Sequence, residues 1–338
     1  MRYIIIGAGA VGGTIGGCLF QGGHDVVLVA RGAHLDALRS QGLTLATPLG
    51  TDTLDIRTVG GPGELTLQDG DVLVLSTKSQ DTAGVLNDWA WQPVGGTADR
   101  TAGQALPIVC AQNGVANEGF ALRRFRHVYG MCVWLPAIHL EPGRVLAQGT
   151  PLAGLLPIGR YPSGTDATAE EIGTDLAGSR FLAPVTDDVM RWKYGKLLSN
   201  LSNAIEALSG YEARFSDDAR ELRERTRAEA LAALGAAGIA YASGDEITAA
   251  RGNNVNIGEI NGSPQAGGSS WQSLSRGTGT IEADFLNGEI VLLGRTHGVP
   301  TAVNETLQKM ANQAARERRA PGSMTPRDIL SAVVGSAG

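Results

Sequence analysis

The chain has 338 residues, and 43% of them are hydrophobic, which provides enough apolar surface for a large core and excludes a disordered chain. Its 28 Lys and Arg residues against 34 Asp and Glu residues give a net charge of −6, which does not suit a nucleic-acid-binding protein. We therefore expect a soluble globular protein of two domains, in which some of the 47 glycines meet a need for backbone freedom.

The first thirty residues predict a strand, a glycine-rich turn, a helix and a second strand. The strands are expected over residues 3–6 and 25–29, which are short apolar runs rich in β-branched side chains. Between them a G-x-G-x-x-G pattern opens the helix, the context in which this pattern binds a dinucleotide rather than forming a plain glycine turn. The candidate cofactor-binding loop consists of Gly7, Ala8, Gly9, Ala10, Val11 and Gly12.

Each glycine of this loop has an expected role. Gly7 would allow the tight turn after the strand, and Gly9 would let a pyrophosphate approach the backbone. Gly12 would let the helix pack closely against the strand. The N–H groups at the helix start would then face the phosphates.

Two cations placed after strands indicate a preference for NADP. Where an NAD-binding unit carries an acidic residue at the end of its second strand, this chain has Arg31, whose fork of N–H donors suits a 2′-phosphate. Lys78 follows a predicted buried strand over residues 72–75 and would join Arg31 on that phosphate. The alternatives are a solvated loop charge for Arg31 and a plain surface lysine for Lys78.

The rest of the first domain continues the strand pattern. A strand is expected over residues 107–110, and the amide of Asn113 after it offers a donor and an acceptor to the nicotinamide end of a cofactor, although an Asn-Gly pair is also a common turn. Over residues 128–184 short β-rich pieces alternate with turns, which predicts an antiparallel extension. We expect residues 1–186 to form the NADP-binding domain and residues 187–338 a helical domain that carries the substrate site.

The second half of the chain reads as helices. The stretch from Asp217 to Ala237 is rich in helix-forming residues and predicts one long helix. A single helix is also expected over residues 191–205, and at about 100° per residue it would place Lys196, Asn200 and Asn203 on one face. Burying a lysine and two amides is costly without partners, so this face is either a ligand site or a solvated polar stripe.

The order of these motifs resembles one protein family along nearly the whole chain. The glycine-rich loop is followed by Arg31, Thr77-Lys78, Asn113-Gly114, Lys196-Leu-Leu-Ser-Asn200 and Ile281-Glu282-Ala-Asp-Phe-Leu-Asn287-Gly288. In this order and spacing the chain is similar to the ketopantoate reductase family. With the antiparallel extension predicted above, the resemblance implies an α/β fold with an N-terminal Rossmann-type doubly wound sheet and an all-α C-terminal domain. It also implies NADPH-dependent reduction of a 2-keto acid in the cleft between the domains.

The resemblance also implies the catalytic residues. Lys196 matches the family's catalytic lysine, and its ammonium would polarise the substrate carbonyl and supply a proton. Glu282 matches the acidic residue that contacts the substrate hydroxyl and the lysine. The alternative for Glu282 is an acid in the first turn of a helix capped by Thr280 or Thr278.

The substrate-binding residues follow from the same resemblance. Asn200 and Ser270 match substrate-binding residues, and Asn113 matches the asparagine of the cofactor domain's N-G motif, where it would contact cofactor and substrate. Many relatives carry another asparagine eight residues after the lysine, whereas this chain has Ala204 there and Asn203 one residue earlier. We include Asn203 among the candidate substrate-binding residues.

The sequence therefore predicts an NADP-dependent oxidoreductase that converts a 2-keto acid to a 2-hydroxy acid, with ketopantoate (2-dehydropantoate) as the first substrate to test. One alternative is a reductase of the same family that acts on another carbonyl or on an imine. The other is a non-catalytic NADP-binding sensor or interaction protein. A Gly/Asn/Ser-rich loop over residues 251–270 has no role that the sequence assigns.

Several features are expected to be absent. The five histidines are scattered without the spacing of a metal site, and we expect no metal. The three cysteines are expected to be buried reduced thiols. With neither a signal peptide nor a membrane span, these features indicate a cytoplasmic protein. The expected partner is a small-molecule 2-keto acid. The sequence does not determine the oligomeric state, and the helix over residues 217–237 is a candidate surface for a homodimer.

Overall fold

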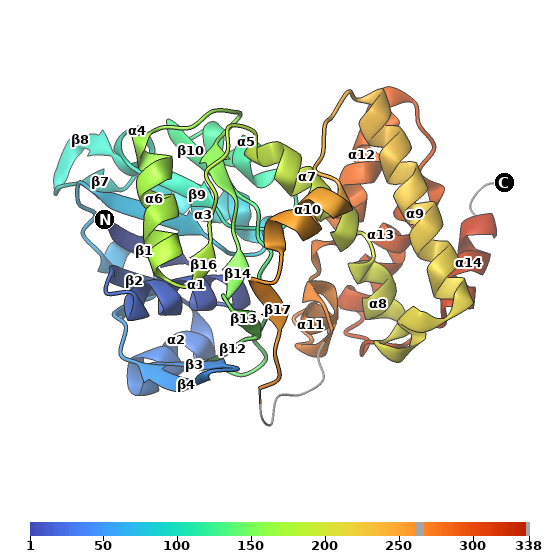
Figure 1. Cartoon of the computed structure of the whole chain (residues 1–338), viewed down its shortest axis with the longest axis horizontal. Helices are drawn as coiled ribbons and strands as arrows, with labels where there is room; N and C mark the ends of the chain where they lie inside the picture. Colours follow the sequence, from blue (N-terminus) through green and yellow to red (C-terminus); the bar gives the residue numbers. More distant parts are fainter. Residues whose placement is uncertain (261–266, 336–338) are drawn as a thin grey trace. The chain divides into compact units, whose positions relative to one another are not determined.

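The computed structural model describes residues 1–260 and 267–335, and the chain divides into two compact units (Figure 1). The first, called the sheet unit below, comprises Met1–Lys193 and Ser243–Ser263. The second, called the helical unit, comprises Tyr194–Ala242 and Pro264–Gly338. This division falls later than the expected boundary at residue 186, and it returns a second, separate segment to the sheet unit.

The sheet unit is built on a seven-stranded sheet in the order β15-β10-β9-β6-β1-β2-β5. Its strands are β1 (Arg2–Ile6), β2 (Asp25–Val29), β5 (Thr58–Val59), β6 (Asp71–Leu75), β9 (Pro107–Cys110), β10 (His127–Met131) and β15 (Ile158–Arg160). Neighbours pair in parallel, except that β15 is antiparallel to β10. The strand order reverses beside β1, and ligands of such sheets bind at the carboxyl ends of the strands at this switch point. The predicted Rossmann-type doubly wound sheet is confirmed.

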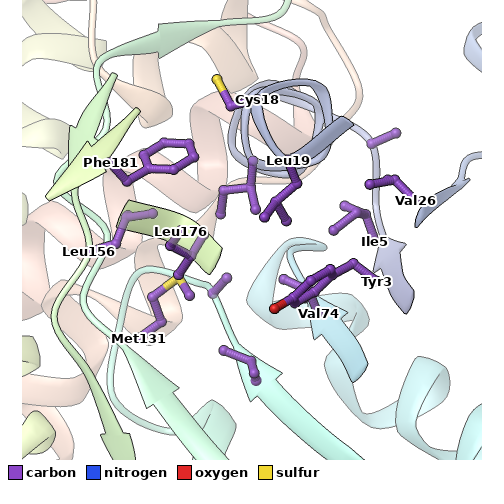
Figure 2. Packing of buried hydrophobic residues seen from close by; sticks show 14 of the residues in the cluster. Tyr3, Ile5, Cys18, Leu19, Val26, Val74, Met131, Leu156, Leu176 and Phe181 are labelled. Atoms are coloured by element: carbon purple, nitrogen blue, oxygen red, sulfur yellow. The ribbon is translucent and has the colours of Figure 1, made fainter. Parts of the chain in front are cut away.

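Helices cover both faces of this sheet, so β1 is buried on both sides. Tyr3 and Ile5 lie in the core on the α1 face, whereas Ile4 and Ile6 lie in the opposite core with residues of α3. Figure 2 shows Tyr3 and Ile5 beside Leu19 of α1. The helices of the sheet unit are α1 (Ala10–Gln21), α2 (Gly32–Gln41), α3 (Thr82–Ala90), α4 (Ala102–Ala105), α5 (Asn117–Leu122), α6 (Ala167–Gly178) and α10 (Gly244–Arg251), with 3-10 turns η1 (Pro62–Glu64) and η2 (Ser79–Asp81).

The smaller sheets refine the predicted extension. A four-stranded sheet in the order β11-β12-β3-β4 combines a hairpin that the sequence reading missed with two strands from the extension. The strands of the smaller sheets are β3 (Leu43–Thr47), β4 (Gly50–Leu54), β7 (Pro93–Val94), β8 (Thr97–Thr101), β11 (Ala137–Ile138), β12 (Arg144–Ala147), β13 (Gly149–Pro151), β14 (Gly154–Leu155), β16 (Phe181–Leu182) and β17 (Val255–Ile257). The extension is therefore mixed: β11 is antiparallel to β12, but β12 is parallel to β3. β17, from the returning segment, is antiparallel to β13.

The described part of the helical unit contains only helices, as predicted. They are the second half of α7 (Val189–Asn200), then α8 (Asn203–Ser209), η3 (Glu212–Phe215), α9 (Asp217–Ala236), α11 (Ser269–Ser275), η4 (Glu282–Phe285), α12 (Asn287–His297), α13 (Ala302–Arg316) and α14 (Pro326–Gly335). The long helix expected from Asp217 is α9, and the hydroxyl of Ser216 caps it by accepting from the Ala219 N–H at 3.2 Å. Within residues 1–260 and 267–335, no helix is both long and apolar enough to cross a membrane.

The prediction of one helix over residues 191–205 is wrong. α7 ends at Asn200 and α8 begins at Asn203, with a turn at Leu201 and Ser202 between them. The Ser202 hydroxyl donates to the Ser199 carbonyl at 2.9 Å. A side chain thus makes a hydrogen bond to the backbone at the turn between α7 and α8. Neither Gly nor Pro marks this break in the sequence.

Candidate active site

The glycine-rich loop between β1 and α1 tolerates no side chain at two positions. Gly7 has φ of +104°, and a Cβ there would lie 2.9 Å from the backbone nitrogen of Thr77. A Cβ on Gly12 would collide with the Gly7 carbonyl oxygen and would lie 2.9 Å from Cγ2 of Ile5. These contacts fit the roles expected of the two residues, a tight turn and close packing of helix on strand.

Gly9, at the N-cap of α1, faces open space instead. Among the described residues, only Cδ2 of His139 comes within 4 Å of the place of its missing Cβ, at 3.9 Å. Because the N-cap residue is Gly9, no N-cap side chain accepts from the N–H groups of the first turn of α1, and this turn holds no acidic residue. The N–H groups of this turn therefore suit an anion, and the loop fits the pyrophosphate of a dinucleotide.

Arg31 and Lys78 both follow strands that flank the loop. Arg31 is the N-cap of α2, is 85% exposed and lies 2.8 Å from the carboxylate of Asp81. Lys78 is the N-cap of η2, which ends at Asp81. Because exposed ion pairs are weak, a phosphate can compete with Asp81 for the Arg31 guanidinium.

Gln112 and Asn113 lie just past the carboxyl end of β9. The Gln112 side-chain amide donates to the Thr77 carbonyl and to the Thr82 hydroxyl, both at 2.9 Å, and so ties β9 to the segment after β6. The Asn113 carbonyl accepts from the Asn117 side chain at 3.1 Å. Within the described residues, the side-chain oxygens of Gln112 and Asn113 are buried without a hydrogen-bond partner. Two such acceptors suit a ligand that carries N–H or O–H donors, as a nicotinamide carboxamide and a ribose do.

A buried ion pair lies behind these residues and was missed by the sequence reading. Nζ of Lys193, on α7, is 2.6 Å from Oε1 of Glu118, on α5, and the two side chains are 2% and 0% exposed. Lys193 also donates to the carbonyls of Gln112 at 2.9 Å and Met131 at 3.3 Å. Burial and the negative charge of Glu118 hold the pKa of the neighbouring Cys110 thiol well above its usual value, against the effect of Lys193. No local pattern joins residues so far apart in the chain, so the sequence offers no signal for this pair.

In the helical unit, Lys196 and Asn200 lie one turn apart on α7 and share a face, as predicted. Asn200 is buried, and its Nδ2 has no partner among the described residues. Asn203 does not belong to this face, because it begins α8 after the break. Its Nδ2 donates instead to the Ser269 hydroxyl at 3.3 Å, which joins α8 to α11.

Glu282 and Ser270 are both buried in the helical unit. Glu282 begins the 3-10 helix η4 and so lies in the first turn of a helix, as the alternative expected, but the N-cap is Ile281 rather than Thr280 or Thr278, and it makes no side-chain cap bond. Ser270 lies in the first turn of α11. Residues 261–266 of the predicted loop 251–270 lie outside the described residues.

Arg276 adds a cation to this region that the sequence reading did not single out. Burial lowers the pKa of its guanidinium, and the negative charge of Glu282 opposes that shift. Arg276 and Glu282 are close enough for their charges to interact. With Lys196, Asn200 and Ser270 of the same unit, they are the kinds of group that can bind and protonate an anionic carbonyl compound. The three cysteines are free and buried, as predicted.

Comparison with known proteins matches both units. Residues 3–162 match the model of ketopantoate reductase PanE/ApbA, and residues 188–315 match that of the ketopantoate reductase PanE/ApbA C terminal. A 2-dehydropantoate 2-reductase of Archaeoglobus fulgidus is 26% identical over 311 residues, which are 90% of this chain and 95% of that protein. One of Pyrococcus horikoshii is 29% identical over 202 residues, 59% of this chain and 61% of that protein.

One solved structure with a similar fold is not a 2-dehydropantoate 2-reductase by name but a D-mandelate dehydrogenase. The ternary structure of D-mandelate dehydrogenase with NADH and anilino(oxo)acetate has a TM-score of 0.77 and is 20% identical. The similarity covers 95% of this chain and 100% of that one. At this level of identity the likeness concerns the fold.

Proposed function

Because this chain belongs to the ketopantoate reductase PanE/ApbA family, which includes oxidoreductases, we propose that it reduces 2-dehydropantoate to pantoate with NADPH. One observation carries the proposal: a loop that requires glycine at Gly7 and Gly12 occurs in the same chain as Lys196 and Asn200, which lie one turn apart on α7. The loop suits a dinucleotide, and the α7 pair suits an anionic carbonyl compound. Residues 1–186 and 187–338 are proposed to supply the cofactor site and the substrate site, respectively.

In the proposed reaction NADPH supplies the hydride that reduces the substrate carbonyl carbon. The Lys196 ammonium donates a hydrogen bond to the carbonyl oxygen, stabilises the negative charge that develops there and delivers the proton that makes the hydroxyl. The Glu282 carboxylate accepts from this lysine or from the new hydroxyl. Asn200 and Ser270 provide the donors that hold the substrate carboxylate.

The proposed cofactor site uses the loop from Gly7 to Gly12 for the pyrophosphate and Asn113 for the nicotinamide end. Arg31 and Lys78 are proposed to hold the 2′-phosphate that distinguishes NADPH from NADH. The exposed Arg31 guanidinium, paired with Asp81, supports this assignment because a doubly charged phosphate is a stronger partner than one carboxylate.

The test is consumption of NADPH, followed by its absorbance, with 2-dehydropantoate and a panel of other 2-keto acids. Lys196→Ala is expected to lower kcat by roughly 10²- to 10⁴-fold, the usual contribution of a general acid. Lys309→Ala is the matched control, because Lys309 is an exposed lysine on α13 of the same unit. If Lys196→Ala turns over as fast as Lys309→Ala, the proposed mechanism is wrong.

A second candidate is a reductase of the same family that acts on another carbonyl or imine. Ala204 is buried where many relatives carry an asparagine, and Asn203 is bonded to Ser269. The similarity in fold to D-mandelate dehydrogenase with NADH supports testing the keto acid of mandelate with NADH in the same panel. A higher kcat/KM for that pair than for 2-dehydropantoate with NADPH would favour this candidate. Tight NADPH binding without turnover of any compound would favour a non-catalytic sensor.

A further inference from the structure

A line of buried hydrogen bonds crosses the helical unit and ends at Leu201, next to the candidate substrate-binding residue Asn200. It begins at Glu229 on α9, passes through Asn304 on α13 and Asn287 at the start of α12, and ends at the backbone of Leu201. Asn304 and Asn287 are 0% and 1% exposed. Polar groups buried this deeply are stabilised only when their partners are correctly oriented.

Glu229 determines which way the Asn304 amide faces. Its carboxylate accepts from the backbone N–H groups of Val303 and Asn304, at 2.9 and 3.0 Å, and from Nδ2 of Asn304 at 2.8 Å. The same Nδ2 donates to the Thr226 carbonyl at 3.1 Å. Because a carboxylate only accepts, the amide must turn its nitrogen toward α9 and its oxygen the other way.

That oxygen holds Asn287 in turn. Nδ2 of Asn287 donates to Oδ1 of Asn304 at 3.1 Å and to the Leu201 carbonyl at 3.2 Å. Leu201 lies in the turn that interrupts the helical stretch between α7 and α8, directly after Asn200. One amide therefore connects α13 to the end of the helix that carries two candidate site residues.

Asn287 also belongs to the segment that carries the candidate carboxylate. Glu282 begins η4, Leu286 lies between η4 and α12, and Asn287 begins α12. A hydrogen bond that holds Asn287 against Leu201 therefore holds this segment against the end of α7. η4 is also held to α13, because Asp284 accepts from the side chains of Gln308 at 2.8 Å and Asn312 at 2.7 Å. Those bonds fix η4 on α13, whereas the Asn287 bond connects the same segment to the end of α7 and so specifies its register there.

We propose that Asn304, oriented by Glu229, is a positioning residue that keeps Glu282 in register with Lys196 and Asn200. The inference rests on the proposed function, since it assigns catalytic work to Lys196 and Glu282. Asn304 itself is given no contact with substrate or cofactor. A role in positioning predicts a loss in kcat, whereas the residues proposed for the cofactor all lie in the sheet unit and should bind NADPH as before.

The test compares Asn304→Ala with Gln313→Ala in the full-length protein. Gln313 is the matched control, because it is another amide on α13 that makes an exposed hydrogen bond, to Glu317. We expect Asn304→Ala to lower kcat on the order of 10- to 100-fold and to leave KM for NADPH unchanged. An unchanged kcat would overturn the proposal, as would equal losses in kcat and NADPH affinity.

A charge exchange tests the bond itself. Asn304→Asp alone sets two carboxylates against each other and should impair kcat more than Asn304→Ala does. Adding Glu229→Gln removes one of the two charges, and the new amide on α9 can donate to the new carboxylate on α13, whose second oxygen still accepts from Asn287. The rescue is only partial, because the Thr226 carbonyl loses its donor and one backbone N–H at the start of α13 loses its acceptor. We expect kcat of the double variant to recover in part. A double variant as poor as Asn304→Asp alone would count against the network.

Amide hydrogen exchange separates failure of this inference from failure of the proposed function. In Asn304→Ala, the amides of residues 281–288 should exchange faster than in the wild type, whereas in Gln313→Ala they should not. This readout needs no substrate, so it holds even if the wild type reduces none of the compounds tested. Faster exchange confined to α13 would show that Asn304 stabilises only its own helix, and this result would overturn the proposed positioning role.

Discussion

The two units build their candidate sites in different ways. In the sheet unit, the loop after β1 is shaped by missing side chains: Gly7 and Gly12 are glycines because backbone and neighbouring atoms occupy the space of a Cβ. In the helical unit, Glu282 and Asn200 lie on separate elements whose register depends on side-chain amides such as Asn287 and Asn304. The candidate cofactor loop is therefore determined by a short contiguous stretch of sequence, whereas the candidate substrate site depends on contacts between residues that are distant in the sequence.

Each kind of site is vulnerable to a different kind of substitution. A backbone-shaped loop fails when atoms are added, because close-packed surroundings cannot yield to a new methyl group. A site assembled by amides fails when atoms are removed, because each lost partner leaves another buried group unpaired. Substitutions in both units can therefore test this contrast.

The largest loss of stability is expected at the Lys193–Glu118 ion pair, where the sheet unit itself depends on side chains that are far apart in the sequence. Glu118→Leu would leave the Lys193 ammonium buried without a counter-charge and should cost about 3–5 kcal/mol of unfolding free energy. Adding Lys193→Met replaces the pair by apolar groups and should recover most of that loss. Urea unfolding followed by circular dichroism measures both. A double variant no more stable than the single one would show that the two charges are not coupled.

The next effect tests the backbone-shaped loop. Gly12→Ala should lower the free energy of unfolding by about 1–3 kcal/mol and abolish dinucleotide binding, because the new methyl group collides with the Gly7 carbonyl. The matched control is Gly84→Ala, since no described atom lies within 4 Å of the missing Cβ of Gly84 in α3. There we expect no loss, or a gain of up to about 1 kcal/mol. Thermal unfolding and NADPH titration check both; similar behaviour of the two variants would contradict the steric argument.

A smaller effect concerns the choice of cofactor. Arg31→Ala should weaken NADPH binding roughly 10- to 100-fold, the contribution of a charge-assisted hydrogen bond, and should affect NADH binding little. Asp81→Asn removes the competing carboxylate 2.8 Å from Arg31 and should tighten NADPH binding. Fluorescence titration with both nucleotides measures these changes. Equal losses for NADPH and NADH in Arg31→Ala would rule out a 2′-phosphate role.

The smallest effect is a pH dependence of the returning segment. Hydrogen bonds from the Arg191 guanidinium and the Ser243 N–H lower the pKa of Glu246, in α10, from its usual 4.5 to about 2. A carboxylate with a lowered pKa stabilises the fold above pH 4.5, and this contribution disappears as the pH falls through about 2. The protection of the α10 amides, which is the intrinsic exchange rate at each pH divided by the measured rate, should therefore fall between these values in the wild type. Glu246→Gln should remove that dependence; its persistence would assign it to another group.

The sequence predicts the parts of the two sites that depend on contiguous residues and misses the parts that depend on contacts between distant residues. The loop from Gly7 to Gly12 and the strand on each side could be predicted because their signals are contiguous. The break at Leu201 was not predicted, because neither Gly nor Pro marks it. Its signal is weaker: Ser and Asn residues surround Leu201 and favour caps and turns, and one of them, Ser202, bonds the backbone there. The Lys193–Glu118 pair had no signal because its partners meet only in the folded chain.

The segment over residues 243–260 has a consequence for how the protein can be divided. It leaves the helical unit, adds α10 and pairs β17 with β13, so the sheet unit is drawn from two separate stretches of chain. A gene fragment that ends at residue 193 would express a sheet unit whose β13 lacks this partner, and an unpaired strand edge invites aggregation. The two units therefore cannot be shuffled between proteins as contiguous cassettes, and a domain exchange would have to transplant both stretches together.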